Sequence, residues 1–124
     1  MRIGSALLAP AILLASPLAA KAGDMNLAVF IPKAERLIEK GALALFSSDM
    51  KVLKGEVEGA SADYRARITR DKAAGRTPHS CPPAKGSMNS EELMAHFTSY
   101  PQSRRANVTV RTAFFALMKQ KYPC

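Results

Sequence analysis

The sequence predicts an all-α protein, a single small domain of about four helices whose last two are joined to the preceding loop by one disulfide. Apolar residues recur at spacings of three and four in four separate segments, which is typical of amphipathic helices. The run of β-branched residues from Val108 to Val110 lies inside one of these segments. The chain has two cysteines, Cys81 and Cys124, which allow one internal bridge.

Residues 1–22 have the pattern of a signal peptide. Arg2 supplies a positive start, residues 6–18 are mainly apolar, and Ala20-Lys21-Ala22 is a small-x-small cleavage signature before Gly23. The apolar run is too short to span a bilayer, although an uncleaved anchor or a buried helix is the alternative interpretation. We therefore expect export to the periplasm, cleavage near Ala22, no stable membrane anchor, and a helical domain of residues 23–124.

The chain is basic. Its net charge is +8, and removing Arg2 and Lys21 from the 18 basic residues leaves 16 against 10 acidic ones, a net charge of +6. Such a charge suits an acidic protein patch, an anionic membrane surface or an anionic polymer, and it is equally consistent with ordinary solubility. Nucleic-acid binding is not expected, because the protein is exported and aromatic residues do not interleave with the basic ones.

The first helix is predicted over residues 26–40. Pro32 lacks a backbone donor, so the helix either starts near Pro32 or kinks there, and Gly41 is a natural stop. Residues 42–46 are apolar and are expected to form a short helical turn. The apolar face of the first helix comprises Leu27, Phe30, Ile31, Ala34, Leu37 and Ile38.

The second helix is predicted over residues 48–74, with Ser48 as its N-cap. Its apolar residues form a narrow stripe that suits packing against other helices. A long loop follows over residues 75–87, stiffened by prolines and containing Cys81. The stripe comprises Leu53, Val57, Ala60, Tyr64 and Ile68.

The third and fourth helices are predicted over residues 90–100 and 104–122. Asn89 is the expected N-cap of the third helix, with Glu91 and Glu92 in its first turn, where the helix dipole favours negative charge. The spacing of Asn89 and Glu92 is that of a capping box. The expected buried residues are Leu93, Met94, Phe97 and Tyr100 in the third helix and Val110, Ala113, Phe114, Leu117 and Met118 in the fourth.

The two cysteines favour a structural disulfide in an exported protein. Two free thiols, an intermolecular bridge and a redox pair are the other interpretations, although a redox pair more often has Cys-x-x-Cys spacing. His79 and His96 show no zinc-type spacing, so neither a metal nor a cofactor is expected. The chain also lacks the common hydrolase and phosphate-loop motifs, and we do not expect an enzyme.

Basic residues cluster near the end of the second helix. Guanidinium groups suit bidentate contact with carboxylates, which predicts a docking surface for an acidic partner. A solvated helix face is the alternative interpretation, because Asp63 and Asp71 dilute the cluster. The cluster comprises Arg65, Arg67, Arg70, Lys72 and Arg76, and Arg104 and Arg105 form a second one.

Residues 81–124 resemble the Tai-type immunity proteins. The resemblance lies in the Cys81-Pro82 start, the helix with Leu93, the Tyr100-Pro101 break, the Arg104-Arg105 pair and the Tyr122-Pro123-Cys124 end. That family comprises small periplasmic helical proteins that bind and block peptidoglycan amidase effectors of type VI secretion systems. The resemblance implies that Cys81 and Cys124 form the structural pair and that the protein is a stoichiometric inhibitor.

The expected function is therefore that of a periplasmic immunity protein that occludes the active site of a cell-wall amidase. The expected contact surface is the loop 76–87 with the arginines beside it. The alternative is a periplasmic stress or holding chaperone, or a structural envelope protein without a toxin partner. The residues expected to contact the partner are Arg65, Arg70, Arg76, Pro78 and His79.

Overall fold

Helices account for nearly all the regular structure of residues 21–124, which the computed structural model describes. The predicted signal peptide lies outside the described residues except for Lys21 and Ala22. The expected all-α fold is confirmed, and within the described range the only β contact is an isolated bridge between Asn26 and Thr109. The elements are α1 (Leu27–Lys40), η1 (Gly41–Phe46), α2 (Ser48–Ala73), α3 (Ser90–Thr98), η2 (Gln102–Asn107) and α4 (Val110–Lys121), where η denotes a 3₁₀ helix.

Each α-helix begins at a polar side chain that accepts a hydrogen bond from a backbone N–H in its first turn. Asn26 caps α1 at 3.1 Å, Asn89 caps α3 at 2.8 Å and Thr109 caps α4 at 3.1 Å. The cap of α2 is Ser47, whose hydroxyl accepts at 3.3 Å, so the expected N-cap at Ser48 is wrong by one residue. The expected cap at Asn89 is confirmed.

Helix α1 begins at Leu27, five residues before Pro32, which confirms the predicted range 26–40 and rules out the alternative of a start near this proline. Pro32 is exposed, while Leu27, Phe30 and Ile31 on the other side of the helix are buried. Burial of these three side chains offsets the hydrogen bond that a proline removes. The expected buried position of Ile38 is also wrong, because 67% of its surface is exposed.

The fourth predicted helix starts too early. Residues 102–107 form η2, Val108 and Thr109 are extended, and α4 begins only at Val110. The Val108 carbonyl accepts a hydrogen bond from Leu27 N–H at 2.9 Å, and Val110 N–H donates to the Met25 carbonyl at 2.8 Å. The β-branched run thus pairs with the chain before α1 rather than continuing a helix.

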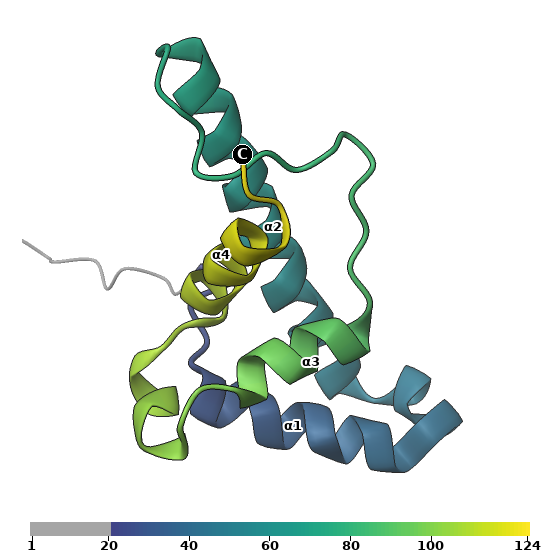
Figure 1. The fold of residues 1–124 in the computed structure, drawn as a ribbon. Helices are drawn as coiled ribbons and strands as arrows, with labels where there is room; N and C mark the ends of the chain where they lie inside the picture. Colours follow the sequence, from purple (N-terminus) through teal and green to yellow (C-terminus); the bar gives the residue numbers. More distant parts are fainter. Residues whose placement is uncertain (1–20) are drawn as a thin grey trace, which may run out of the picture.

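Helix α2 is the long central element, and its carboxyl-terminal turns extend beyond the other helices (Figure 1). It packs on α4 along its middle and on α1 near its start, while α3 lies against α1 and α4. Phe30 of α1 and Phe97 of α3 meet edge to face, with ring centroids 5.3 Å apart. The largest fully buried apolar side chains are Tyr64, Phe97, Leu27, Ile31 and Val110.

Candidate functional site

The disulfide between Cys81 and Cys124 joins the loop after α2 to the carboxyl end of the chain. The two Cα atoms are 4.8 Å apart, and Cys81 N–H donates to the Tyr122 carbonyl at 2.8 Å. The predicted pairing is confirmed. The link encloses α3, η2 and α4, as expected for the last two predicted helices.

Tyr64 of α2 holds the residues just before this disulfide. Its side chain is 1% exposed, and its hydroxyl hydrogen-bonds with Ser80 Oγ and, at 2.9 Å, with His79 Nδ1. The Tyr64 ring packs on Phe115 of α4, with centroids 4.9 Å apart. Burial, followed by the positive charges of Arg67 and Lys119, lowers the pKa of His79. This arrangement fixes the loop on two helices.

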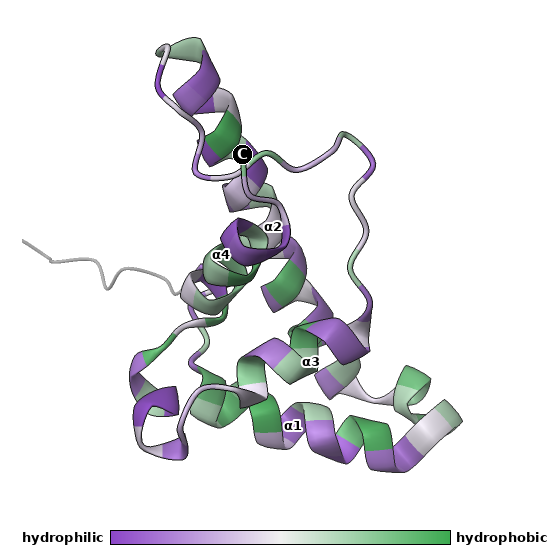
Figure 2. Cartoon of the chain, in the orientation of Figure 1, coloured by the Kyte–Doolittle hydropathy of each residue, from purple (hydrophilic) through white to green (hydrophobic). Residues whose placement is uncertain are grey.

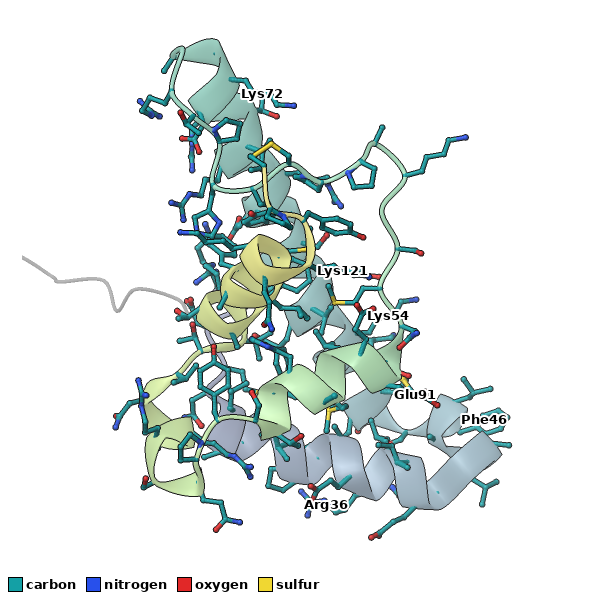
Figure 3. The ribbon with its side chains drawn as sticks, in the orientation of Figure 1. Arg36, Phe46, Lys54, Lys72, Glu91 and Lys121 are labelled. Atoms are coloured by element: carbon teal, nitrogen blue, oxygen red, sulfur yellow. A yellow bond between two sulfur atoms is a disulfide. The ribbon has the colours of Figure 1, made fainter. Side chains whose placement is uncertain are left out.

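Lys121 holds the other end of the same loop, at Ser87. Its ammonium donates to the Ser87 carbonyl at 2.8 Å and to Glu92 Oε2 at 2.8 Å. The hydrogen bond to Glu92 raises the pKa of Lys121. Residues 82–86 therefore cross between two fixed points, and this segment is called the bridged loop below. Lys121 lies beside that loop in Figure 3.

A cleft of about 520 Å³ lies between the bridged loop and the helices α2 and α4. Its walls combine apolar side chains such as Ile68 and Met118 with the polar side chains of Ser61 and Arg65. Arg65 is exposed and donates to Ser61 Oγ at 2.9 Å. Of the residues expected to contact a partner, Arg65 is the one that lines this cleft.

The other four expected contact residues fall into two groups. Arg70 and Arg76 are exposed at the protruding end of α2 and just after it, and Arg76 is paired with Asp71 at 3.2 Å. Pro78 and His79 are half-buried at the disulfide. The Pro78 carbonyl lies 3.9 Å from Cys124 Sγ. The structure thus places Pro78 and His79 beside the disulfide and leaves the arginines spread along the second half of α2 and the residues after it.

Sequence reasoning missed the most exposed apolar part of the described chain. Phe46 is 88% exposed, and it points away from the helices at the outer corner labelled in Figure 3. Green segments mark the same corner in Figure 2. We call this the η1 apolar surface, and it comprises Ile38, Leu43, Leu45, Phe46 and Val52. The available signal was the uninterrupted apolar run 42–46, directly after Gly41.

An apolar groove of about 320 Å³ adjoins this surface between α1, η1, α2 and α3. Ile38 belongs to both, and Leu37, Met50 and Met94 line the groove floor and walls. Methionines adapt their shape to a bound apolar group. The groove and the η1 apolar surface share Ile38, and both present apolar side chains to another molecule.

Lysines flank η1 on both sides in the sequence. Lys40 precedes η1 and Lys51 follows it, and both are exposed. Lys54 lines the groove and is paired with Glu58 at 3.9 Å, whereas Lys33 is paired with Asp49 at 3.4 Å. An apolar centre with a charged rim is the usual composition of a protein-binding surface.

Residues 21–124 lack two further features. Within that range, no helix combines the length and apolar character that crossing a bilayer requires. Nor does any group of three or more His, Cys, Asp or Glu side chains in the same part of the chain lie close enough together to hold a metal ion. Comparison with protein-family models, curated proteins and solved structures finds no match to the chain.

Proposed function

We propose that the protein is an exported inhibitor, an immunity protein that binds a peptidoglycan amidase effector and covers its active site. The η1 apolar surface carries the binding part of this proposal. The resemblance of residues 81–124 to Tai-type immunity proteins supports the choice of an amidase as the partner. Export rests on the signal pattern of residues 1–22.

The composition of the η1 apolar surface supports a protein partner. Leu43, Leu45 and Phe46 lie on one short helix and are mostly exposed, although a solvated domain gains nothing from exposing them. Large apolar and aromatic side chains are the usual centre of an interface. Because Lys40 and Lys51 flank them, the matching partner surface has an apolar depression with carboxylates at its edge.

The bridged loop supplies a second contact in this proposal. Cys81 and Lys121 fix its two ends, so little conformational entropy is lost when it meets a partner. Arg65 lies in the cleft below it and can pair with a carboxylate. A loop held in this way can cover an active-site cleft without being ordered on binding.

Calorimetric titration against a purified peptidoglycan amidase effector tests the first contact. We expect Leu45→Asp and Phe46→Asp each to raise Kd at least tenfold, equivalent to about 1.4 kcal/mol, because each removes an apolar anchor. Val29→Asp is the matched control, since Val29 is an exposed apolar residue near the other end of α1. Wild-type affinity for both surface variants contradicts the proposed contact.

A charge-reversal pair tests the second contact separately. Arg65→Glu together with Arg70→Glu is expected to weaken binding and to reduce its dependence on salt. The control is Arg36→Glu, an exposed position on α1. If the pair binds as tightly as the wild type, the cleft and the end of α2 do not contact the amidase.

A holding chaperone is the second candidate function, and two observations favour it. The η1 apolar surface is exposed, and burial lowers the pKa of both His79 and His96, so acid charges groups that the fold keeps neutral. A chaperone suppresses aggregation of many acid-denatured proteins below pH 5 without a specific partner. An immunity protein does not, so a light-scattering assay with two unrelated client proteins separates the two functions.

A further inference from the structure

The Glu56 carboxylate holds the segment before α1. Glu56 of α2 accepts hydrogen bonds on one oxygen, Oε2, from two backbone amides, Gly23 N–H at 2.6 Å and Met25 N–H at 3.1 Å. Glu56 is half-buried and Gly23 is buried. The Glu56 carboxylate therefore binds the backbone of the residues just after the predicted cleavage point.

Helix α4 holds the same segment from the other side. Arg111 N–H donates to the Gly23 carbonyl at 2.9 Å, and the Arg111 side chain pairs with Asp24 and, at 2.8 Å, with Asp63. Gly23 has a φ of 103°, and a Cβ at this position would lie 3.1 Å from Arg111 Nη2. The positive φ and the close approach of Arg111 both favour glycine at this position.

The local charge is unbalanced. The charged groups around Gly23 are Glu56 and Asp63 from α2, Arg111 from α4, Asp24 beside it in the chain, and Lys21, whose positive charge acts on Asp24 in the uncleaved chain. Cleavage after Ala22 removes Lys21, so that three carboxylates surround one guanidinium with a net charge of −2. A cation at the Gly23 nitrogen reduces this repulsion, whereas a neutral peptide N–H does not.

The sequence provides such a cation. Hydrolysis of the Ala22–Gly23 peptide bond by a signal peptidase adds water, leaving a carboxylate on Ala22 and an amine on Gly23 that takes up a proton. We propose that Glu56 is the receptor for this new α-ammonium group, so that cleavage of the signal peptide creates an ion pair that locks the amino terminus onto α2 and α4. The inference shares the export step with the proposed function but depends on no partner.

Cleavage also clears the space around the new terminus. In the uncleaved chain, Ala22 lies directly against Gly59 of α2. A Cβ on Gly59 would be only 2.6 Å from the Ala22 methyl. The Ala22 carbonyl accepts from Arg111 Nη2 at 3.0 Å, so its removal frees one guanidinium donor for the nearby carboxylates. The ammonium, with three donors in place of one, remains against Glu56.

Intact mass and amino-terminal sequencing of protein purified from the periplasm give the first test. We expect the mature chain to begin at Gly23, and any other first residue overturns the proposal. This result does not depend on whether an amidase binds, so its failure is distinct from failure of the proposed immunity function.

A thermodynamic cycle that combines acetylation of the α-amine with the Glu56→Gln substitution gives the second test. Selective acetylation of the α-amine is expected to raise the unfolding equilibrium constant about three- to tenfold in the wild type, and much less in Glu56→Gln. Glu58→Gln is the matched control, because Glu58 is exposed on the same helix and pairs with Lys54. An equal effect of acetylation in wild type and Glu56→Gln overturns the proposal.

A pH titration of the α-ammonium group in the wild-type protein gives the third test. The ion pair predicts that the Gly23 α-ammonium, labelled with ¹⁵N-glycine, titrates above the usual range of about 7.7 to 8.0. The stabilisation is then present below pH 8 and is lost as the pH rises through the higher folded-state pKa. A pKa at or below the usual range contradicts the ion pair.

Discussion

Tyr64 holds the two residues that precede Cys81 and the bridged loop. One hydroxyl reaches both His79 and Ser80, and its ring fills the space between α2 and α4. Because Ser80 is fully buried, its hydroxyl needs a partner inside the protein. The sequence shows Tyr64 as one member of an apolar stripe, and nothing in its spacing indicates this polar contact.

Replacing Tyr64 with phenylalanine tests this role. Tyr64→Phe keeps the ring and removes the partner of Ser80, so we expect it to lower the free energy of unfolding by about 1 to 3 kcal/mol in urea denaturation. Tyr100→Phe is the control, because the Tyr100 hydroxyl lies 3.5 Å from His96 and is only half-buried. Equal losses in the free energy of unfolding for the two variants contradict this role of Tyr64.

The histidines predict how stability depends on pH. Burial lowers the folded-state pKa of His79 and His96 below the usual value of 6.5, so the unfolded chain binds more protons as the pH falls. The free energy of unfolding is therefore expected to decrease from pH 7 to pH 5. Each of His79→Gln and His96→Gln is expected to flatten this profile in urea titrations, and an unchanged slope in both contradicts the assignment.

At the scale of helices, the sequence pattern located the packed segments and both ends of the first two helices to within one residue, but it did not locate the start of the fourth helix. The Leu53 to Ile68 stripe of α2 is buried as predicted, apart from the half-buried Val57. The start of α4 depends on pairing between Val108 and Leu27, which are distant in the sequence. Local spacing carries no information about such a contact, and the same limit explains the exposed Ile38.

The predicted cap of α3 can be tested directly. Asn89→Ala removes the side-chain acceptor of the Glu92 amide, and we expect a loss of about 1 kcal/mol in the free energy of unfolding. The control is Asn107→Ala, an exposed asparagine at the end of η2. If the two variants unfold at the same urea concentration, the cap contributes nothing to stability.

At the scale of the whole molecule, the disulfide is the feature that sequence reasoning located best. Two cysteines allow one internal pair, so no spatial information was needed. The η1 apolar surface could not be located in this way. Whether an apolar run is covered depends on which helices pack beside it, and α3 covers the groove floor near Leu93 but not Phe46.

Removing the disulfide tests how far the fold depends on it. We expect Cys81→Ser with Cys124→Ser to lower the free energy of unfolding by roughly 4 kcal/mol, because the unfolded chain gains freedom across a sequence separation of 43 residues. Reduction of the wild type is expected to have the same effect. Alkylation of both thiols in native protein without a reductant contradicts the link itself.

The central claim is that this helical domain inhibits a cell-wall amidase through the η1 apolar surface. The most direct measurement is peptidoglycan hydrolysis by a purified amidase effector, titrated with the mature protein. We expect a linear loss of activity to a one-to-one end point, with Phe46→Asp requiring a large excess and Val29→Asp behaving as the wild type. Full hydrolytic activity in the presence of excess wild-type protein contradicts it.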